Sequence, residues 1–264
     1  MPQGKTLLID GDILQYRCAF AAEHTYYLVD GKEYSSAKEY KDAGATGTVW
    51  SRKEIKPVEF AFQAVQTTLR SFGSLFNPAD IRIYLSSDRT FREDVAKTLK
   101  YKGNRDGVAK PKHHKDVREF LLSQGAIVRD GLEADDCLAT DLTSMGDSAI
   151  LLSIDKDLDQ VEGQHYNWVT DEFYTINKKG GAQNLFIQIL SGDSTDNVPG
   201  LPGWGKIKAD RLVSAAKSPH ELYESVLDAY HKAGKDMDYF MEQANLVYIL
   251  RSEGDSFAKA YPYG

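Results

Sequence analysis

The stretch TLLIDGD, residues 6–12, decides the fold, because three apolar residues run directly into acidic ones. A short, continuously apolar segment is typical of a strand buried on both faces of a parallel sheet. The pattern returns in IRIYLSS at 81–87, before Asp88, and in AILLSI at 149–154, before Asp155. Because helix-like segments separate these strands, we predict an α/β fold with a central, mostly parallel sheet flanked by helices.

The remaining elements follow from periodicity and turn residues. From Pro57 to Phe76 apolar residues recur at steps of three and four, which predicts an amphipathic helix. Residues 23–56 show no clear period and are expected to be a loop, with room for a hairpin. Helices are further predicted at 13–22, 117–123 and 132–144, a short strand at 126–129, a two-stranded meander at 166–176, and helices from 182 onward, interrupted by a Gly/Pro-rich hairpin at 198–205.

Bulk composition indicates an ordinary globular chain of 264 residues, with 42% hydrophobic residues and a net charge of −7. It contains no apolar run long enough for a membrane span, and the N-terminus is expected to be a strand rather than a signal peptide. Cys18 and Cys137 lie in apolar helical contexts and are expected to be reduced thiols, so we predict a cytoplasmic protein.

Carboxylates dominate the candidate site. The carboxyl ends of parallel strands share one edge of a sheet, so the aspartates that follow the three strands are expected to converge there. Such a density of like charge requires a cation, and hard oxygen ligands favour Mg²⁺ or Mn²⁺; nine carboxylates suffice for two ions. Taken singly, these residues are also typical of helix caps and turns. The nine are Asp10, Asp88, Glu133, Asp135, Asp136, Asp155, Asp157, Asp193 and Asp196.

A basic segment offsets this acidic set, since residues 97–118 contain eight lysines and arginines against two aspartates. Without the nine carboxylates, the rest of the chain would be slightly basic. Within this region the arginines and lysines of residues 91–105, among them Lys100, are candidates to hold phosphates, and Tyr101 is a candidate to stack on a base. The alternative is a solvated loop rich in lysine.

A second candidate nucleic-acid element is the Gly/Pro-rich stretch VPGLPGWGKIKADRL, residues 198–212. Gly203 and Gly205 leave backbone N–H groups free to approach phosphate oxygens, and Lys206 and Lys208 add positive charge at the start of the next helix. Such a hairpin would hold duplex DNA without reading its bases. The alternative is an ordinary corner between two helices.

Six motifs resemble, in the same order, those of the 5′-nuclease family, which includes polymerase-I 5′-nuclease domains, phage 5′-exonucleases and flap endonucleases. The resemblance covers residues 5–215, and the C-terminal QANLVYILR is most similar to podovirus-type phage exonucleases, such as that of phage T7. The motifs are LLIDGD at 7–12, SSDRTFR at 86–92, YKGNR at 101–105, LEADD at 132–136, SIDKDL at 153–158 and GDSTDNVPGLPGWGK at 192–206.

The resemblance implies a PIN-like, Rossmann-like catalytic domain over residues 1–180, with a basic arch segment at about 91–118. A helical subdomain over 181–264 would contain a helix–hairpin–helix element at 198–208. The resemblance also implies that Arg92, Lys102 and Arg105 grip the scissile phosphate. It assigns Asp10, Asp88, Glu133 and Asp135 to a first metal, and Asp136, Asp155, Asp157, Asp193 and Asp196 to a second.

The expected activity is a metal-dependent 5′→3′ exodeoxyribonuclease acting near duplex ends, nicks or flaps. RNA paired to DNA is a further expected substrate, and the chain is expected to act as a monomer without a membrane partner. Because only some ten residues separate Arg105 from the helix predicted near Val117, the arch is short, which favours recessed or nicked ends over a threaded flap. Two alternatives remain open: a PIN-type ribonuclease and a non-catalytic DNA-junction binder.

Overall fold

The computed structural model describes residues 1–263, which form two compact units. Unit 1 consists of residues 1–10, 78–108 and the described chain from Ile127 onward, and unit 2 consists of Gly11–Asn77 and Ala109–Ala126. The domain boundary predicted after residue 180 divides a catalytic domain from a helical subdomain, and it does not coincide with the border between these two units. It therefore stays a prediction.

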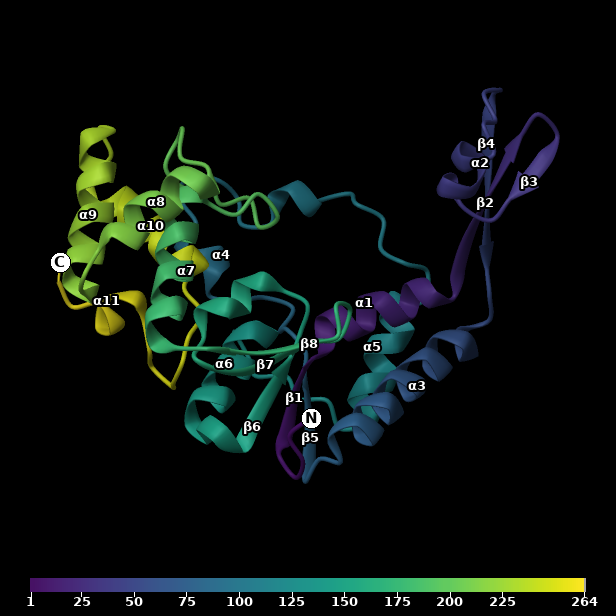
Figure 1. Cartoon of the computed structure of the whole chain (residues 1–264), viewed down its shortest axis with the longest axis horizontal. Coiled ribbons are helices and arrows are strands. Elements are labelled where there is room, and N and C mark those ends of the chain that lie inside the picture. Colours follow the sequence, from purple (N-terminus) through teal and green to yellow (C-terminus); the bar gives the residue numbers. More distant parts are fainter. Residues whose placement is uncertain (264) are drawn as a thin grey trace. The chain divides into compact units, whose positions relative to one another are not determined.

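Unit 1 is built on a five-stranded sheet in the order β5-β1-β6-β7-β8 (Figure 1). The first four strands are parallel neighbours and β8 runs antiparallel to β7, which confirms the predicted mostly parallel sheet and the meander. The strands are β1 (Thr6–Asp10), β5 (Asp80–Tyr84), β6 (Ala149–Leu152), β7 (Gly163–Asn167) and β8 (Glu172–Ile176).

Helices complete unit 1. They are α4 (Arg92–Val95), α6 (Ala134–Met145), α7 (Lys178–Ser191), α8 (Lys206–Ala215), α9 (Pro219–Lys232), α10 (Met237–Val247) and α11 (Phe257–Ala260), with 3₁₀ helices η1 (Gly103–Arg105), η2 (Gly146–Ser148) and η3 (Lys156–Gln160). Apolar residues explain why this body holds together, since all five residues of β1 and all four of β6 are buried. As predicted, the described chain from 182 onward is mostly helical and is interrupted by the turn region at 192–205.

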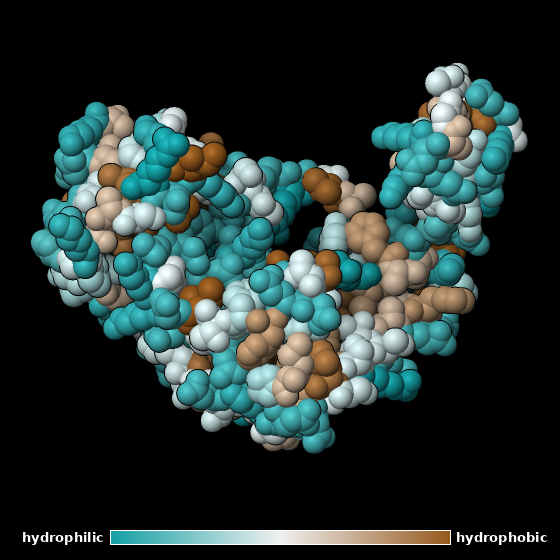
Figure 2. Space-filling view, viewed as in Figure 1, coloured by the Kyte–Doolittle hydropathy of each residue, from teal (hydrophilic) through white to brown (hydrophobic). Residues whose placement is uncertain are grey.

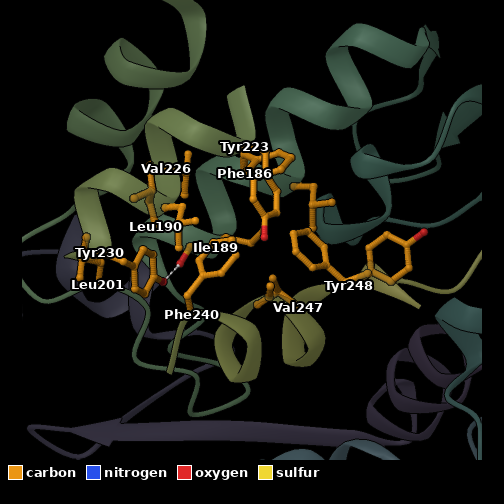
Figure 3. Close-up of a cluster of buried hydrophobic side chains, with 14 of the residues drawn as sticks. Phe186, Ile189, Leu190, Leu201, Tyr223, Val226, Tyr230, Phe240, Val247 and Tyr248 are labelled. Atoms are coloured by element: carbon orange, nitrogen blue, oxygen red, sulfur yellow. Dashed lines mark hydrogen bonds between the residues drawn. The ribbon is translucent and has the colours of Figure 1, made fainter. Parts of the chain in front are cut away.

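An aromatic cluster packs the C-terminal helices of unit 1 (Figure 3). Phe186 of α7, Tyr223 of α9 and Phe240 of α10 are each 1% exposed or less. The buried Tyr230 hydroxyl donates to the Ile189 carbonyl at 2.5 Å, so this polar group does not lose a hydrogen bond on burial. Helix α10, which contributes contacts to the candidate site, is therefore fixed by a close-packed core.

Two predictions about secondary structure are wrong. The strand predicted at 126–129 is a single parallel bridge between Ile127 and Tyr84. Gly125 has a φ of +91° and Gly131 a φ of +72°, so turns on both sides leave too little extended backbone for a strand. The loop predicted at 23–56 contains a three-stranded antiparallel sheet, order β3-β2-β4, so only the expectation of a hairpin within it is confirmed.

Unit 2 combines this sheet with four helices. Its elements are α1 (Gly11–Ala21), β2 (Glu23–Val29), β3 (Lys32–Tyr34), α2 (Ala37–Asp42), β4 (Val49–Ile55), α3 (Val58–Phe76) and α5 (His114–Ser123). Helices α3 and α5 meet where Phe62 stacks on Phe120, with ring centroids 4.5 Å apart. The β2–β3–β4 sheet is mainly hydrophilic on its visible face (Figure 2), and every residue of β4 is exposed, which explains why hydrophobic periodicity did not reveal it.

Among the described residues, no helix has the length and apolarity that crossing a membrane requires. Cys18 and Cys137 are both free thiols and both buried, as predicted. Burial raises the pKa of each thiol to about 11, so neither is an activated nucleophile.

Candidate active site

The first part of the site is the edge of the sheet where β1 and β6 end. Asp10 is the last residue of β1, and its Oδ2 accepts a hydrogen bond from Ser153 Oγ at 2.6 Å. The same hydroxyl oxygen accepts from the Asp155 backbone N–H at 2.9 Å. Through these two hydrogen bonds, Ser153 connects the end of β1 to the segment that follows β6. Asp10 and Asp155 therefore lie close together, as predicted for residues at the shared edge of parallel strands.

The first turn of α6 supplies the next carboxylates. Glu133 is the N-cap of α6, and Asp136 closes a capping box with its backbone. Asp135 lies between them. Burial and the neighbouring charges of Asp10 and Asp155 raise the pKa of the Asp135 carboxyl well above its usual value. These three aspartates, far apart in the sequence, thus form one group of mutually repelling acids.

A second acidic group surrounds Asp157. Burial raises the pKa of this carboxyl to about 8, and Asp155, Asp193 and Asp196 add to the increase. Asp193 and Asp196 lie in the loop after α7, where Asp193 pairs with Val198 through two backbone hydrogen bonds of 2.8 Å. The structure therefore brings together carboxylates from β1, α6, η3 and the α7–α8 loop, as the sequence predicted.

Cations and a tyrosine cover these carboxylates. Lys102 Nζ donates to Glu133 Oε1 at 2.7 Å, and Arg105 forms an ion pair with Asp196. The Tyr101 hydroxyl lies 2.7 Å from Asp196 Oδ2 and 3.1 Å from Glu133 Oε2. Although burial alone would raise it, Arg92 and Lys102 hold the pKa of Glu133 below its usual value.

The YKGNR segment is held in place by the α7–α8 loop. The Lys102 backbone N–H donates to the Asp196 carbonyl at 2.9 Å, and Asn104 Nδ2 donates to the Ser194 carbonyl at 2.6 Å. Lys102 itself has a φ of +54°, a left-handed conformation that is uncommon for a residue other than glycine. Strain of this kind persists only where surrounding contacts enforce it, and it aims the Lys102 side chain at Glu133.

Four predicted site residues do not have the positions that their predicted roles require in this arrangement. Asp88 is exposed in the loop after β5, and it is not among the described residues that line the acidic pocket. Arg92 and Asp136 are 2% and 0% exposed, and they form a bidentate ion pair with each other. Tyr101 is only 7% exposed, so stacking on a base, which stays a prediction, requires its ring to leave these contacts.

The pocket at the centre of the site is lined by one arginine, Arg92, by polar and apolar residues, and by five carboxylates, which are Glu133, Asp135, Asp157, Asp193 and Asp196. In the arrangement described for residues 1–263, no three histidine, cysteine or carboxylate side chains form a complete metal-ligand set. The chemistry of the donors nevertheless fits divalent cations. All are hard oxygen ligands, and the raised pKa of Asp135 and of Asp157 reflects burial together with repulsion from neighbouring carboxylates, which a cation would relieve.

The turn region between α7 and α8 presents free backbone groups. Gly203 has a φ of +79° and is exposed, with no atom within 4 Å of the position a Cβ would take. Gly205 is the N-cap of α8 and makes no side-chain cap, so the first N–H groups of the helix are available to an anion. Lys206 and Lys208 are exposed there, and the Lys208 ammonium lies 4.0 Å from the centre of the Trp204 ring.

Sequence reasoning missed two residues that organise the site. Ser153 bridges Asp10 and Asp155, and Asn197, with a φ of +61°, donates from Nδ2 to the Lys100 carbonyl at 2.9 Å. A small hydroxyl residue directly after an apolar strand and an asparagine next to a turn are weak signals by themselves. Their neighbours in space, not in sequence, give them their roles.

Known proteins support the resemblance found in the sequence. No family model matches the chain. It is 30% identical over 148 residues to flap endonuclease Xni of Shewanella piezotolerans, a match that covers 51% of this chain and only 58% of that protein. It is 23% identical to the exonuclease of Escherichia phage T7, covering 93% of this chain and 88% of the phage protein.

Among solved structures, the D15 protein of phage T5, co-crystallised with metal ions, superposes with a TM-score of 0.58, at 15% identity, over 92% of this chain and 88% of that one. At this identity the likeness concerns the fold. The structure is thus that of a 5′-nuclease fold, and its relatives by sequence carry the names flap endonuclease and exonuclease. The predicted resemblance to the 5′-nucleases is confirmed, while the chain spans little more than half the length of the flap endonucleases it matches.

Proposed function

We propose that this protein is a divalent-metal-dependent 5′-nuclease that hydrolyses phosphodiester bonds near the 5′ ends of duplex DNA. The observation that carries the proposal is the close grouping of Asp10, Asp135, Asp155 and Asp157, with Lys102 bound to the neighbouring Glu133. Asp10 and Asp155 add to the raised pKa of Asp135, and Asp155 adds to that of Asp157, so this group of carboxylates forms a place for cations. A lysine held at their rim supplies charge for a phosphate.

The metal group would consist of Mg²⁺ ions, two in number, for which Mn²⁺ can substitute. Bound there, they would lower the pKa of the attacking water and stabilise charge on the leaving 3′-oxygen. Asp10, Glu133 and Asp135 form the side of the pocket that would hold the first ion. Asp155, Asp157, Asp193 and Asp196 form the side that would hold the second. Asp88 belongs to the first group by resemblance, and its exposed position would let it act through water.

The chain's own cations would act on the phosphate. Lys102 and Arg105 are bound to Glu133 and Asp196 in the free protein, so both stand at the carboxylates before substrate arrives. When those carboxylates bind metal, the two cations are free to pair with phosphate oxygens and neutralise charge at the phosphorus. Because they are positioned in advance, the reaction does not require reorganisation of solvent at that step.

Duplex DNA would be held by the turn between α7 and α8, as the helix–hairpin–helix resemblance implies. Exposed Gly203, the uncapped start of α8 and Lys208 offer N–H groups and charge to a phosphate backbone, and none of these groups reads a base. RNA paired to DNA is accommodated by the same contacts. We expect one copy of the chain to suffice, since the pocket is lined by residues of unit 1 alone.

A recessed or nicked end is the favoured substrate over a threaded flap. The 3₁₀ helix η1 ends at Arg105 and α5 begins at His114, so only eight residues join them. A segment of this length, even fully extended, spans at most about 3.5 Å per residue and leaves little chain for an arch around a single strand. Flap cleavage remains part of the proposal as a slower activity.

The experiment is cleavage of a 5′-labelled nicked duplex with and without Mg²⁺, followed by sizing of the labelled products. Metal-dependent release of short 5′ products is the expected result. A preference for single-stranded RNA would instead indicate a PIN-type ribonuclease. Tight DNA binding with intact label in both Mg²⁺ and Mn²⁺ would indicate a non-catalytic junction binder.

A further inference from the structure

Arg92 lines the acidic pocket but is 2% exposed, and its guanidinium is held by several hydrogen-bond acceptors. Its Nη1 donates to Asp136 Oδ2 at 2.6 Å and its Nη2 to Asp136 Oδ1 at 2.9 Å. Nε donates to the Leu246 carbonyl at 3.0 Å, and Nη2 donates also to the Tyr248 carbonyl at 2.7 Å. Phe91 covers the guanidinium face, with the ring centre 4.6 Å away. A phosphate could reach this guanidinium only after four hydrogen bonds had broken.

Asp136 is equally saturated. Besides the two bonds from Arg92, it accepts from the Leu250 backbone N–H at 3.0 Å and from the Glu133 backbone N–H at 3.2 Å. Each carboxylate oxygen thus has two donors and no side is left for a metal ion. The pair fastens the first turn of α6, which carries Glu133 and Asp135, to the chain at residues 246–250.

The same C-terminal segment is held on its other side by Gln160, the last residue of η3. Gln160 is 1% exposed; its Nε2 donates to the Val247 carbonyl at 3.0 Å and its Oε1 accepts from the Ile249 N–H at 3.1 Å. Arg251 adds a bond from Nη2 to the Gln160 carbonyl at 3.0 Å. We name residues 246–251 the strap.

The strap alternates between its two partners. Leu246, Tyr248 and Leu250 present backbone groups to Arg92 and Asp136, while Val247 and Ile249 present theirs to Gln160. Leu246 and Val247 are the last residues of helix α10, and the chain leaves the helix at Tyr248, which has an extended conformation. One side of the strap therefore binds the segment that carries Glu133 and Asp135, and the other binds the segment that follows Asp155 and Asp157.

We propose that the strap sets the spacing between these two carboxylate pairs, and that Arg92 and Gln160 are positioning residues rather than ligands of the substrate. The inference rests on the proposed function, because it takes Glu133, Asp135, Asp155 and Asp157 as the metal-binding groups. In this proposal Arg92 does not bind the phosphate. Its buried guanidinium acts indirectly, because it holds Asp136 and thereby positions Glu133 and Asp135.

Two variants test the proposal. Arg92→Lys keeps the charge, but one ammonium cannot span two carboxylate oxygens and two carbonyls. Gln160→Met keeps the shape and removes both strap bonds without any change of charge. With DNA absent, calorimetric titration with Mn²⁺ should show affinity about tenfold or more weaker in each variant, the usual effect of removing a residue that orients metal ligands. In cleavage assays kcat should fall while KM and duplex affinity stay close to wild type.

Asn184→Leu is the matched control, because it removes a 2.8 Å bond from α7 to the Asp159 carbonyl of the same η3 segment and leaves the strap intact. Circular dichroism melts establish that each variant is folded. If Arg92→Lys does not fold, Gln160→Met decides alone: folded Gln160→Met protein with wild-type Mn²⁺ affinity and kcat would overturn the proposal. Weaker DNA binding with unchanged Mn²⁺ affinity in Arg92→Lys would restore the phosphate-gripping role.

Failure of the proposed function has a different signature. In that case the wild-type protein itself would neither bind Mn²⁺ nor cleave a nicked duplex, whatever the variants do. A wild-type protein that binds and cleaves, together with Gln160→Met and Asn184→Leu variants that lose affinity equally, would show that η3 matters but that the strap does not.

Discussion

The Lys102 ammonium lies 2.7 Å from Glu133 Oε1 and 3.6 Å from Asp196 Oδ2. One cation thus bridges a carboxylate at the start of α6 and a carboxylate of the α7–α8 loop. Although burial would lower it, these two carboxylates raise the pKa of Lys102 above its usual value. The side chain therefore stays charged at every pH at which the protein would work, and its charge stands at the boundary between the two acidic groups.

Replacing Lys102 with Met should lower kcat by about 10²- to 10³-fold, the usual effect of deleting one preorganised donor to a transition state. Single-turnover cleavage of a labelled nicked duplex measures it. Lys97→Met is the control, because Lys97 is an exposed lysine of the same basic segment. Equal losses in both variants would mean that the effect is general electrostatics rather than the position of Lys102.

Replacing Asp155 with Ala should reduce metal-dependent cleavage to background while duplex binding is retained, because Asp155 belongs to both acidic groups. With a chelator present, the melting temperature of the variant should be no lower than that of the wild type, because removal of one negative charge relieves repulsion at Asp135 and Asp157. Asp159→Asn, on the 3₁₀ helix η3 that Asp155 caps but bonded to the Tyr174 hydroxyl, should cleave normally. Wild-type turnover in Asp155→Ala would remove this residue from the site.

Replacing Lys208 with Met should weaken duplex affinity and reduce the slope of log K against log salt by about one, as expected for the loss of one phosphate contact. The kcat at saturating DNA should change little, because Lys208 lies on α8 and not in the acidic pocket. Fluorescence anisotropy over a series of salt concentrations measures the slope. Lys232→Met, on the exposed side of α9 where Lys232 pairs with Asp228, should leave the slope unchanged.

Replacing Gly200 with Ala should be much more destabilising than replacing Gly203 with Ala. Both glycines have positive φ, which costs alanine about 1 to 2 kcal/mol. At Gly200 a Cβ would also meet the Gly192 backbone nitrogen at 2.3 Å, whereas at Gly203 it would enter open space. Urea unfolding of the two variants gives the comparison. Equal losses would indicate that the Gly192–Gly200 contact relaxes without cost.

A pH effect on stability is expected from His165, which is 1% exposed and donates from Nε2 to the Val161 carbonyl at 2.9 Å. Burial lowers the pKa of this imidazole in the folded state. As pH falls below about 6.5, the unfolded chain takes up a proton that the folded protein refuses, so stability is lost towards acid pH. Compared with wild type, His165→Gln should lose less of its free energy of unfolding between about pH 7.5 and about pH 5.5. His220→Gln, at an exposed position, should follow the wild type.

The sequence predicts most of the sheet and of the acidic site because both rest on local patterns. Thr6–Asp10 is a strand with the predicted limits, and the helix expected from Pro57 to Phe76 spans Val58–Phe76. Asp10, Asp135 and Asp155 converge because parallel strands end at one edge, which requires only the order of strands and helices. The exposed β4 strand lacks the alternation of apolar and polar residues that would have predicted it.

The direction of a side chain is harder to predict than its presence. Arg92 follows the SSDRTF motif and carries the charge that a phosphate ligand needs, so its sequence context indicates a role at the substrate. Its actual partners, Asp136 and the carbonyls of Leu246 and Tyr248, lie 44 or more residues away. Nothing in the local pattern distinguishes a guanidinium that faces the pocket from one that faces the strap.

The segment that forms the antiparallel sheet of unit 2 begins after α1 and ends before α3. Its two ends are joined where the Lys56 N–H donates to the Ala22 carbonyl at 2.8 Å. The 33 residues from Glu23 to Ile55 therefore connect the end of α1 to the start of α3, and these two helix ends are adjacent. Because its two ends are adjacent, this segment can change in length as one piece without moving either helix. Differences in length among related nucleases should concentrate there.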